Sequence, residues 1–368
     1  MAYNRIEIQK THYIYEQFHR EADLYHCCVD GKSLPEYLRI WSADYPEDKT
    51  VKMMAPFTDL CPAWSKDLEW EGDVRFVWKA LELERVVLPL LLCPEDADFS
   101  CIVVVAEVEK TKDTVRWNRV GYVLHTGEDF QEEKKSGILD LESYSEEDWE
   151  RYGDNIALEE ADSPAWRQWI SENWAEELYR RRMNYTLPYY QTEGSVFWIK
   201  ETDWVFDRAA YENMLEEYWE ITTWEQLEQY KPKEKLSVRA AADLIARLER
   251  QGWETLDRHL GDYGEILLHV YAGECVSEPL LRLLGKTPAP ERRIRIYCSV
   301  IETLWRYGDE AVVNVVDVTI LERLSDEDVL WQRFGACLSE EFKTYINTEV
   351  LTQNAMMWGV KPFKMPDD

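Results

Sequence analysis

The chain has 368 residues, with 42 Lys and Arg against 72 Asp and Glu, and a formal net charge of -30. Hydrophobic residues make up 45% of it and aromatic residues 13%, which is enough apolar surface to offset the entropy of ordering and excludes extensive disorder. The negative charge repels phosphate backbones and anionic lipid headgroups. Composition therefore argues against nucleic-acid or membrane-surface binding and favours a basic protein partner.

The N-terminal segment and the cysteines predict a cytoplasmic protein. The first residues, MAYNRIEIQKTHYIYEQFHR, lack the apolar core of a secretory signal. The longest apolar runs, such as Val86–Cys93, are shorter than the roughly 20 residues that span a bilayer. The 8 cysteines include no CxxC pair, so we expect reduced and mostly buried thiols.

The first predicted elements in chain order are a short helix and then a small meander of three strands. Ser33, Pro35 and Glu36 have the spacing of a capping box with proline in the first turn, which predicts a short helix. Two β-branched apolar runs follow, and we interpret them as buried strands. In a third run, apolar and polar residues partly alternate, as expected for a half-exposed strand of an antiparallel sheet. The three predicted strands are Val86–Cys93, Cys101–Val108 and Thr114–Val123.

Helical and extended patterns then mix up to residue 230. A capped helix is predicted from Ser145 to Trp149, and another from Ser163 toward Arg182 with Trp166, Trp169, Ile170 and Trp174 as an amphipathic stripe. Gly194–Ile199 predicts a strand, and Asp207–Trp219 predicts a helix. The first part is therefore expected to be α+β with a small antiparallel sheet.

The rest of the chain is predicted to be a separate, all-helical domain. Apolar residues repeat at helical spacing over Val238–Leu248 and Ile294–Trp305, and glycines mark the connections. Residues 1–230 carry 24 basic and 49 acidic side chains, whereas residues 231–368 carry 18 and 23. We place the junction at the proline-interrupted segment Lys231–Lys235. The predicted organisation is an α+β domain over 1–230, a helical domain over 235–352 and a loosely held tail over 353–368.

No motif predicts catalysis, a metal or a cofactor. His26-Cys27-Cys28 is the densest group of metal-ligand side chains, but no second ligand pair accompanies it, so burial is the favoured interpretation. The sequence contains no GxSxG nucleophile elbow and neither of the glycine-rich phosphate-binding motifs. His269 lies in an apolar helical run and is interpreted as a core histidine with satisfied hydrogen bonds.

The strongest candidate binding site is an acidic segment. Residues 128–177 hold 17 acidic and 4 basic side chains. Within it, Tyr144 and Trp149 lie among acidic residues, and this combination of aromatic and charged side chains is typical of an interface hot spot. The alternative, a solvated acidic face that keeps the protein soluble, stays open. The predicted partner-binding residues are Asp140, Glu142, Tyr144, Glu146, Glu147, Asp148, Trp149 and Glu150.

Two segments resemble known bacterial proteins. LLCPEDADFSCIVVVAEVEKTKDTVRWNRVG, residues Leu91 to Gly121, resembles a segment of uncharacterised bacterial proteins. GDYGEILLHVYAGECVSEPLLRLL, residues Gly261 to Leu284, is similar to helical domains of immunity proteins from polymorphic-toxin and contact-dependent inhibition systems. The resemblance implies a cytosolic protein that binds and blocks a toxin domain without catalysis of its own.

The sequence thus predicts a non-catalytic binding protein whose partner is a basic toxin domain. Two alternatives are kept. One is a carbohydrate-active hydrolase that uses paired carboxylates and Trp platforms, because acidic and aromatic residues are both abundant. The other is a protein-interaction scaffold without inhibitory function. The oligomeric state is not predicted.

Overall fold

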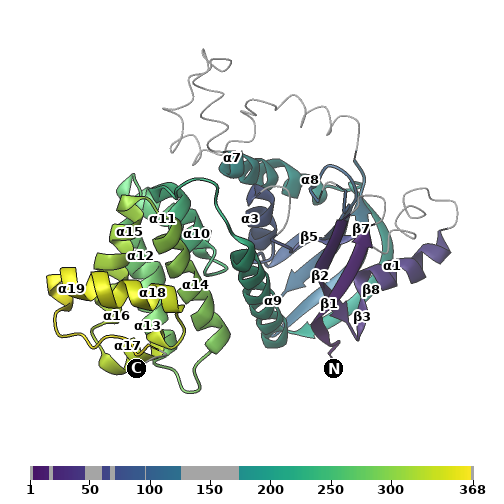
Figure 1. Ribbon diagram of the computed structural model, residues 1–368. Coiled ribbons are helices and arrows are strands. Elements are labelled where there is room, and N and C mark those ends of the chain that lie inside the picture. The colour runs from purple at the N-terminus through teal and green to yellow at the C-terminus, as the bar shows by residue number, and fades with distance from the viewer. Residues whose placement is uncertain are drawn as a thin grey trace, which may run out of the picture. The chain divides into compact units, whose positions relative to one another are not determined.

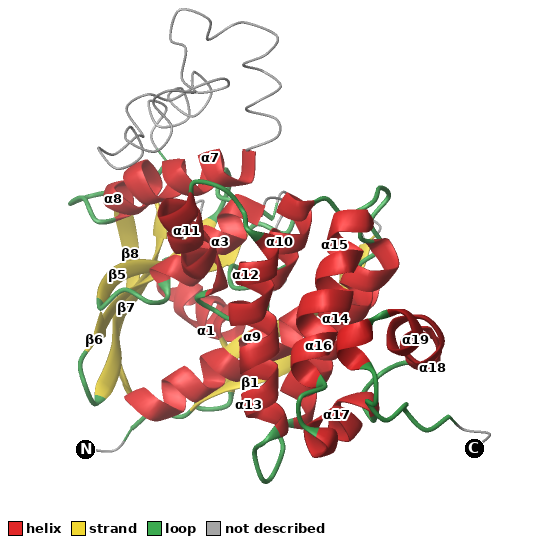
Figure 2. Ribbon diagram, turned by 90° about the vertical axis from the view of Figure 1, so that its left-hand side faces the viewer, coloured by secondary structure: helices red, strands yellow, loops and turns green. Residues whose placement is uncertain are grey.

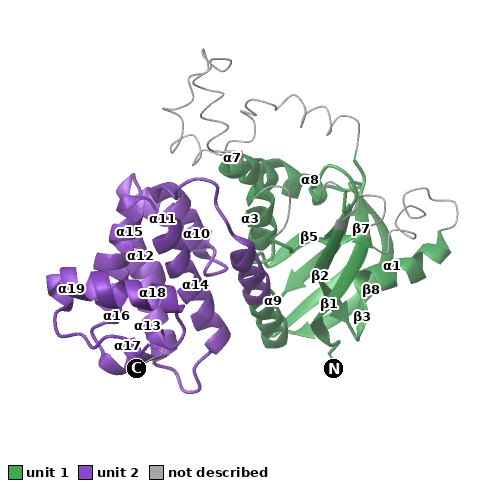
Figure 3. Ribbon diagram, viewed as in Figure 1, with its two compact units in different colours: residues 1–218 green, residues 219–368 purple. Residues whose placement is uncertain are grey.

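The computed structural model describes residues 3–15, 20–45, 60–66, 71–95, 97–125 and 174–365. The chain divides into two compact units, residues 1–218 and 219–368, and the division falls within helix α9, Arg208–Gln229 (Figure 3). The fold class is α+β, with the described sheets in unit 1 and a helical unit 2, as predicted. The predicted junction, Lys231–Lys235, lies between α9 and the next helix.

Unit 1 contains two antiparallel sheets (Figure 1). One has the order β1-β2-β3 and the other the order β4-β5-β6-β7-β8. The predicted meander is confirmed, because β5, β6 and β7 pair in sequence order, and the predicted strand at Gly194–Ile199 extends into β8. The strands are β1 Ile6–Tyr15, β2 Arg20–Val29, β3 Lys32–Ser33, β4 Cys61–Pro62, β5 Arg85–Leu92, β6 Val103–Lys110, β7 Thr114–Val123 and β8 Val196–Asp207.

The first helix of unit 1 begins where the sequence supplies a cap. The Glu36 carboxylate accepts hydrogen bonds from Ser33 N at 2.8 Å and Ser33 Oγ at 3.0 Å, which confirms the predicted capping box. The predicted helix at Asp207–Trp219 is confirmed as the first half of α9. Besides α9, the unit contains α1 Leu34–Trp41, α3 Glu71–Ala80, α7 Trp174–Arg181 and α8 Leu187–Tyr190. The predicted helix at Ser145–Trp149 and residues 163–173 lie outside the described residues.

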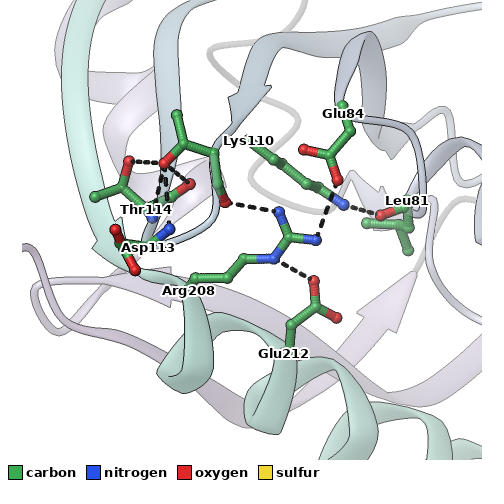
Figure 4. Close-up of polar contacts among 8 residues, drawn as sticks. Leu81, Glu84, Lys110, Asp113, Thr114, Arg208 and Glu212 are labelled. Carbon is green, nitrogen blue, oxygen red and sulfur yellow. Dashed lines mark hydrogen bonds and ion pairs between the residues drawn. The ribbon is translucent and has the colours of Figure 1, made fainter.

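A polar cluster ties the β6–β7 turn to the start of α9 (Figure 4). The Arg208 guanidinium contacts Glu212 at 3.0 Å and Glu84 at 3.5 Å, and it donates to the Thr111 carbonyl at 3.2 Å. The buried ammonium of Lys110 donates to the Leu81 carbonyl. Since these contacts join strand ends to a helix start, the cluster fixes where α9 leaves the sheet.

Unit 2 is built from helices (Figure 2). The predicted helices at Val238–Leu248 and Ile294–Trp305 are confirmed as α10 and α14. Three π-helical turns, Gly273–Ser277, Val316–Ile320 and Ile346–Val350, join pairs of short helices into longer spans. The helices are α10 Val238–Ala246, α11 Gly252–Tyr263, α12 Leu268–Ala272, α13 Glu278–Leu284, α14 Glu291–Tyr307, α15 Glu310–Val315, α16 Leu321–Leu324, α17 Asp328–Gly335, α18 Glu340–Tyr345 and α19 Leu351–Gln353. Among the helices in the described ranges, none combines the length and apolar character that a membrane span requires.

At Phe363 the C-terminal segment packs into the core of unit 2, so the expectation of a loosely held tail is wrong there, and residues 366–368 lie outside the described residues. Phe363 is 3% exposed, and its ring stacks on Trp331 with centroids 4.3 Å apart. Asn347 holds both backbone groups of Phe363, because its Oδ1 accepts from Phe363 N and its Nδ2 donates to Phe363 O, each at 2.9 Å. One aromatic side chain with matched backbone hydrogen bonds therefore docks a segment that shows no hydrophobic period.

Truncation of this docked ring is predicted to destabilise unit 2. Phe363→Ala removes a buried aromatic side chain and should lower the free energy of unfolding by about 3 to 5 kcal/mol. Met356→Ala in the same segment is the matched control, because that side chain is 80% exposed, and it should change stability by less than about 0.5 kcal/mol. Chemical denaturation of both variants measures this, and equal effects would contradict the docking.

Burial also predicts a pH dependence of stability in unit 1. His26 in β2 is 1% exposed, and neither ring nitrogen has a hydrogen-bond partner among the described residues. Burial lowers the pKa of His26 from 6.5 to about 4. Between these values the unfolded chain binds the proton and the folded chain does not, so stability falls as the pH drops from 6.5 toward 4.

The size of this loss is about 3 kcal/mol if the unfolded value is the ordinary one. We expect His26→Phe to flatten the dependence of unfolding free energy on pH in this window. His125→Phe serves as the control, because His125 is exposed. Urea unfolding at a series of pH values tests this, and an unchanged slope in His26→Phe would contradict it.

Candidate partner-binding face

The predicted partner-binding residues lie outside the described part of the chain. This holds for all eight: Asp140, Glu142, Tyr144, Glu146, Glu147, Asp148, Trp149 and Glu150. Their role in binding therefore stays a prediction. The described residues offer a second combination of aromatic and acidic side chains, in unit 2.

This second combination is centred on the turn after α11. We call it the acidic-aromatic face and define it by Asp262, Tyr263, Glu265, Val270 and Glu274. Tyr263, the last residue of α11, is 50% exposed, and Val270 on α12 is 38% exposed. Glu274 lies one turn after Val270, which places the two on one side of their helical span. All five residues are exposed, and they lie at the end of α11, in the turn after it and on the helical span that begins with α12.

Backbone geometry explains why α11 ends at this turn. Gly264 has φ of +73°, the left-handed conformation that glycine adopts at a helix C-terminus without steric cost. Its amide donates to the Leu260 carbonyl at 2.8 Å, and a Cβ built on it would meet no heavy atom within 4 Å. The requirement for glycine is therefore purely conformational.

A buried histidine contacts residues on both sides of the turn and stabilises it. His259 is 3% exposed, and its Nε2 accepts a hydrogen bond from Leu267 N at 3.1 Å. Its ring lies 4.7 Å from the Tyr263 ring and 5.4 Å from the buried Tyr271 ring, centroid to centroid. The exposed tyrosine consequently rests on a fixed aromatic layer, which lowers the entropy that it would lose on binding.

The negative charge of the face is not compensated locally. Asp262, Glu265 and Glu274 are exposed, and no Lys, Arg or His of the described residues lies within ion-pair distance of them. Two other acids of the unit do have ion-pair partners: Arg323 binds Glu278 at 2.8 Å, and Arg306 binds Glu341 at 2.7 Å. The face can therefore attract a basic surface without first breaking an internal ion pair.

His269 borders the face and corrects one expectation. It was expected to be a core histidine, but it is exposed, and its Nδ1 lies 2.6 Å from Thr319 Oγ1. The buried residues of this helix are Leu268, Tyr271 and Ala272, so the intervening position points outward. The helix begins only at Leu268, so the expected helical run over Glu265–Tyr271 is right in part, and the side of the helix that faces the core was predicted wrongly.

His26, Cys27 and Cys28, the densest group of metal-ligand side chains in the sequence, are buried, as expected. No group of three or more His, Cys, Asp or Glu side chains in the described ranges is arranged to hold a metal ion. Eight tryptophans of the described residues are buried: Trp41, Trp64, Trp78, Trp117, Trp204, Trp219, Trp253 and Trp331. Those eight residues form no exposed platform for a sugar.

One family model matches part of the chain. Residues 242–353 match the model of a domain of unknown function, DUF7674. This range contains the whole face and most of unit 2. No curated protein and no solved structure gives a significant match to the chain.

The geometry of the turn is predicted to depend on one glycine. Gly264→Ala must place a Cβ in the left-handed region and should cost about 1 kcal/mol of stability. Gly285→Ala is the matched control, because Gly285 also caps a helix but has φ of -76°, and an added Cβ would make only ordinary contacts, at 3.5 Å or more. Thermal unfolding compares them, and equal costs would contradict the assigned conformation.

Proposed function

We propose that the protein is a non-catalytic binding protein of the immunity type, which binds and neutralises a basic toxin domain in the cytoplasm. The observation that carries this proposal is the acidic-aromatic face, where a half-exposed tyrosine on a supported turn is accompanied by three carboxylates that have no ion-pair partner among the described residues. Aromatic anchors supply much of the binding energy at protein interfaces, and surrounding charge steers association. The resemblance of Gly261–Leu284 to immunity proteins supports the same function.

The charge distribution supports a basic partner. Residues 1–218 carry 24 basic and 46 acidic side chains, and residues 219–368 carry 18 and 26, so both units are negative. Many domains that cleave nucleic acid are basic because their substrate is a polyanion. A protein with this charge can compete with such a substrate for the same surface. The acidic segment around Tyr144 and Trp149 is proposed as a second contact of the same kind.

The first test is a binding measurement with the protein encoded by the adjacent gene, since an immunity gene lies beside its toxin gene. Reversing the three acids of the face, Asp262, Glu265 and Glu274, to Lys should slow association about tenfold at low salt and flatten its salt dependence. The control reverses Glu234, Glu291 and Glu327, which are exposed elsewhere in unit 2 and give the same change in net charge. Equal slowing in both triple variants would contradict a localised face.

The aromatic anchor is tested through dissociation. Tyr263→Ala should raise the dissociation rate about thirtyfold, which corresponds to about 2 kcal/mol at a hot spot. The thermal midpoint should change little, because half of the side chain is already exposed. Dissociation rates and melting temperatures of the same variant decide this, and a large loss of stability with an unchanged dissociation rate would show that Tyr263 is structural only.

A further inference from the structure

Unit 2 contains a cavity of about 400 Å³ beside α14. Its wall is formed by the segment between Trp224 and Lys231, by one side of α14 and by the connection between α17 and α18. Along α14 the lining residues include Arg295, Ser299 and Glu302, whose spacing of four and three places them on one side of the helix. The volume is within the range of about 300 to 1,000 Å³ that small-molecule sites occupy.

Two cationic residues at this cavity have no partner among the described residues. Lys231 and Arg295 are exposed, and the side chain of neither forms a hydrogen bond or an ion pair with the described part of the chain. A third lining cation, Arg306, pairs with Glu341 at 2.7 Å, but the two side chains are 41% and 68% exposed. Because water screens exposed ion pairs, Arg306 can exchange this carboxylate for another anion at small cost. The wall therefore holds two uncompensated cations and a third that is weakly engaged.

The acids of the wall do not neutralise these cations. Both oxygens of the Glu302 carboxylate accept hydrogen bonds, from Ser339 N at 2.7 Å and Ser339 Oγ at 2.6 Å, where Ser339 caps α18. Glu228, the other acid among the described lining residues, is exposed. The Trp224 indole N–H and the Ser299 hydroxyl donate to no described residue. Side chains that can donate and have no partner therefore outnumber unpartnered carboxylates, which suits an anionic ligand.

We propose that this cavity binds a small organic anion that joins a phosphate or carboxylate group to a planar ring. The guanidinium of Arg295 has parallel N–H groups that match two oxygens of either anion, and Lys231 adds a second positive charge. Trp224, Tyr230 and Tyr307 line the same cavity and provide aromatic surface for the planar part. The net charge of the chain is -30, so binding of an anion depends on these local cations and not on the overall field.

The experiment titrates the full-length protein with four small probes and measures binding by isothermal titration calorimetry. Phenyl phosphate and benzoate carry both the anionic group and the ring, inorganic phosphate lacks the ring, and benzylamine reverses the charge. We expect saturable binding of phenyl phosphate or benzoate, about tenfold tighter than that of inorganic phosphate or benzylamine. The affinity should fall as the sodium chloride concentration rises, because salt screens the attraction. The tighter of the two ring-bearing anions identifies the anionic group that the site prefers.

Variants at the cavity locate the binding. Arg295→Gln and Lys231→Gln should each weaken binding of the tighter probe about tenfold, because each removes a charge-assisted contact. Arg282→Gln and Lys286→Gln are the matched controls, since both residues are exposed in unit 2 and neither lines the cavity, and they should change the affinity less than about twofold. In nuclear magnetic resonance spectra, the indole N–H signal that is missing from Trp224→Phe should shift when the probe is added to the unmodified protein.

Titration of the unmodified protein needs no variant, so a misfolded Arg295→Gln would not weaken the test. Absence of saturable binding of both ring-bearing anions up to about 10 mM would overturn the proposal. Equally tight binding of benzylamine, or equal weakening in Arg295→Gln and Arg282→Gln, would do so as well. No partner protein enters these measurements, so the anion site can be tested independently of the proposed function.

Discussion

Unit 1 is organised around the side chain of Trp117, which is completely buried in the middle of β7. Its ring lies within 5.5 to 6.4 Å, centroid to centroid, of four aromatic rings: Trp64, Trp204, Phe206 and Tyr211. These rings come from β8, from the start of α9 and from the segment after β4. One side chain therefore joins the sheet to the helix that follows it.

The backbone of β8 is shaped to make this packing possible. Trp117 and Trp204 are register partners, and the pairing of β7 with β8 shifts immediately afterwards, between Trp117 and Arg119. Asp203 has φ of +49° at this irregularity, and the Thr202 hydroxyl donates to the Trp117 carbonyl at 2.7 Å. A β-bulge re-aims side chains in this way, here placing Trp204 against the aromatic cluster. Unit 2 uses a similar local device, the left-handed Gly264, to present Tyr263.

Local signals in the sequence predicted several elements but not β1, β2, α3 or α11, and two errors came from effects that local signals do not contain. β7 has the predicted bounds, and the capping box at Ser33 is present, because alternation and cap chemistry act over a few residues. The tail was misjudged because a single residue, Phe363, docks it on Trp331, and such a contact leaves no periodic pattern. The side of α12 that faces the core was predicted wrongly, because packing against neighbouring helices determines that Leu268 and Tyr271 are buried. The glycine that follows Tyr263 indicates in the sequence that a helix ends there. The exposure of Tyr263, and the lack of ion-pair partners for the nearby acids among the described residues, are evident only from the structure.

We propose that the acidic-aromatic face binds a basic protein. Hydrogen–deuterium exchange of the full chain, with and without the protein encoded by the adjacent gene, tests this claim most directly. The account predicts slower exchange of the amides from Gly261 to Glu274 in the complex, because binding buries the turn and restricts its opening. Unchanged exchange across this segment, with protection elsewhere in unit 2, would contradict it.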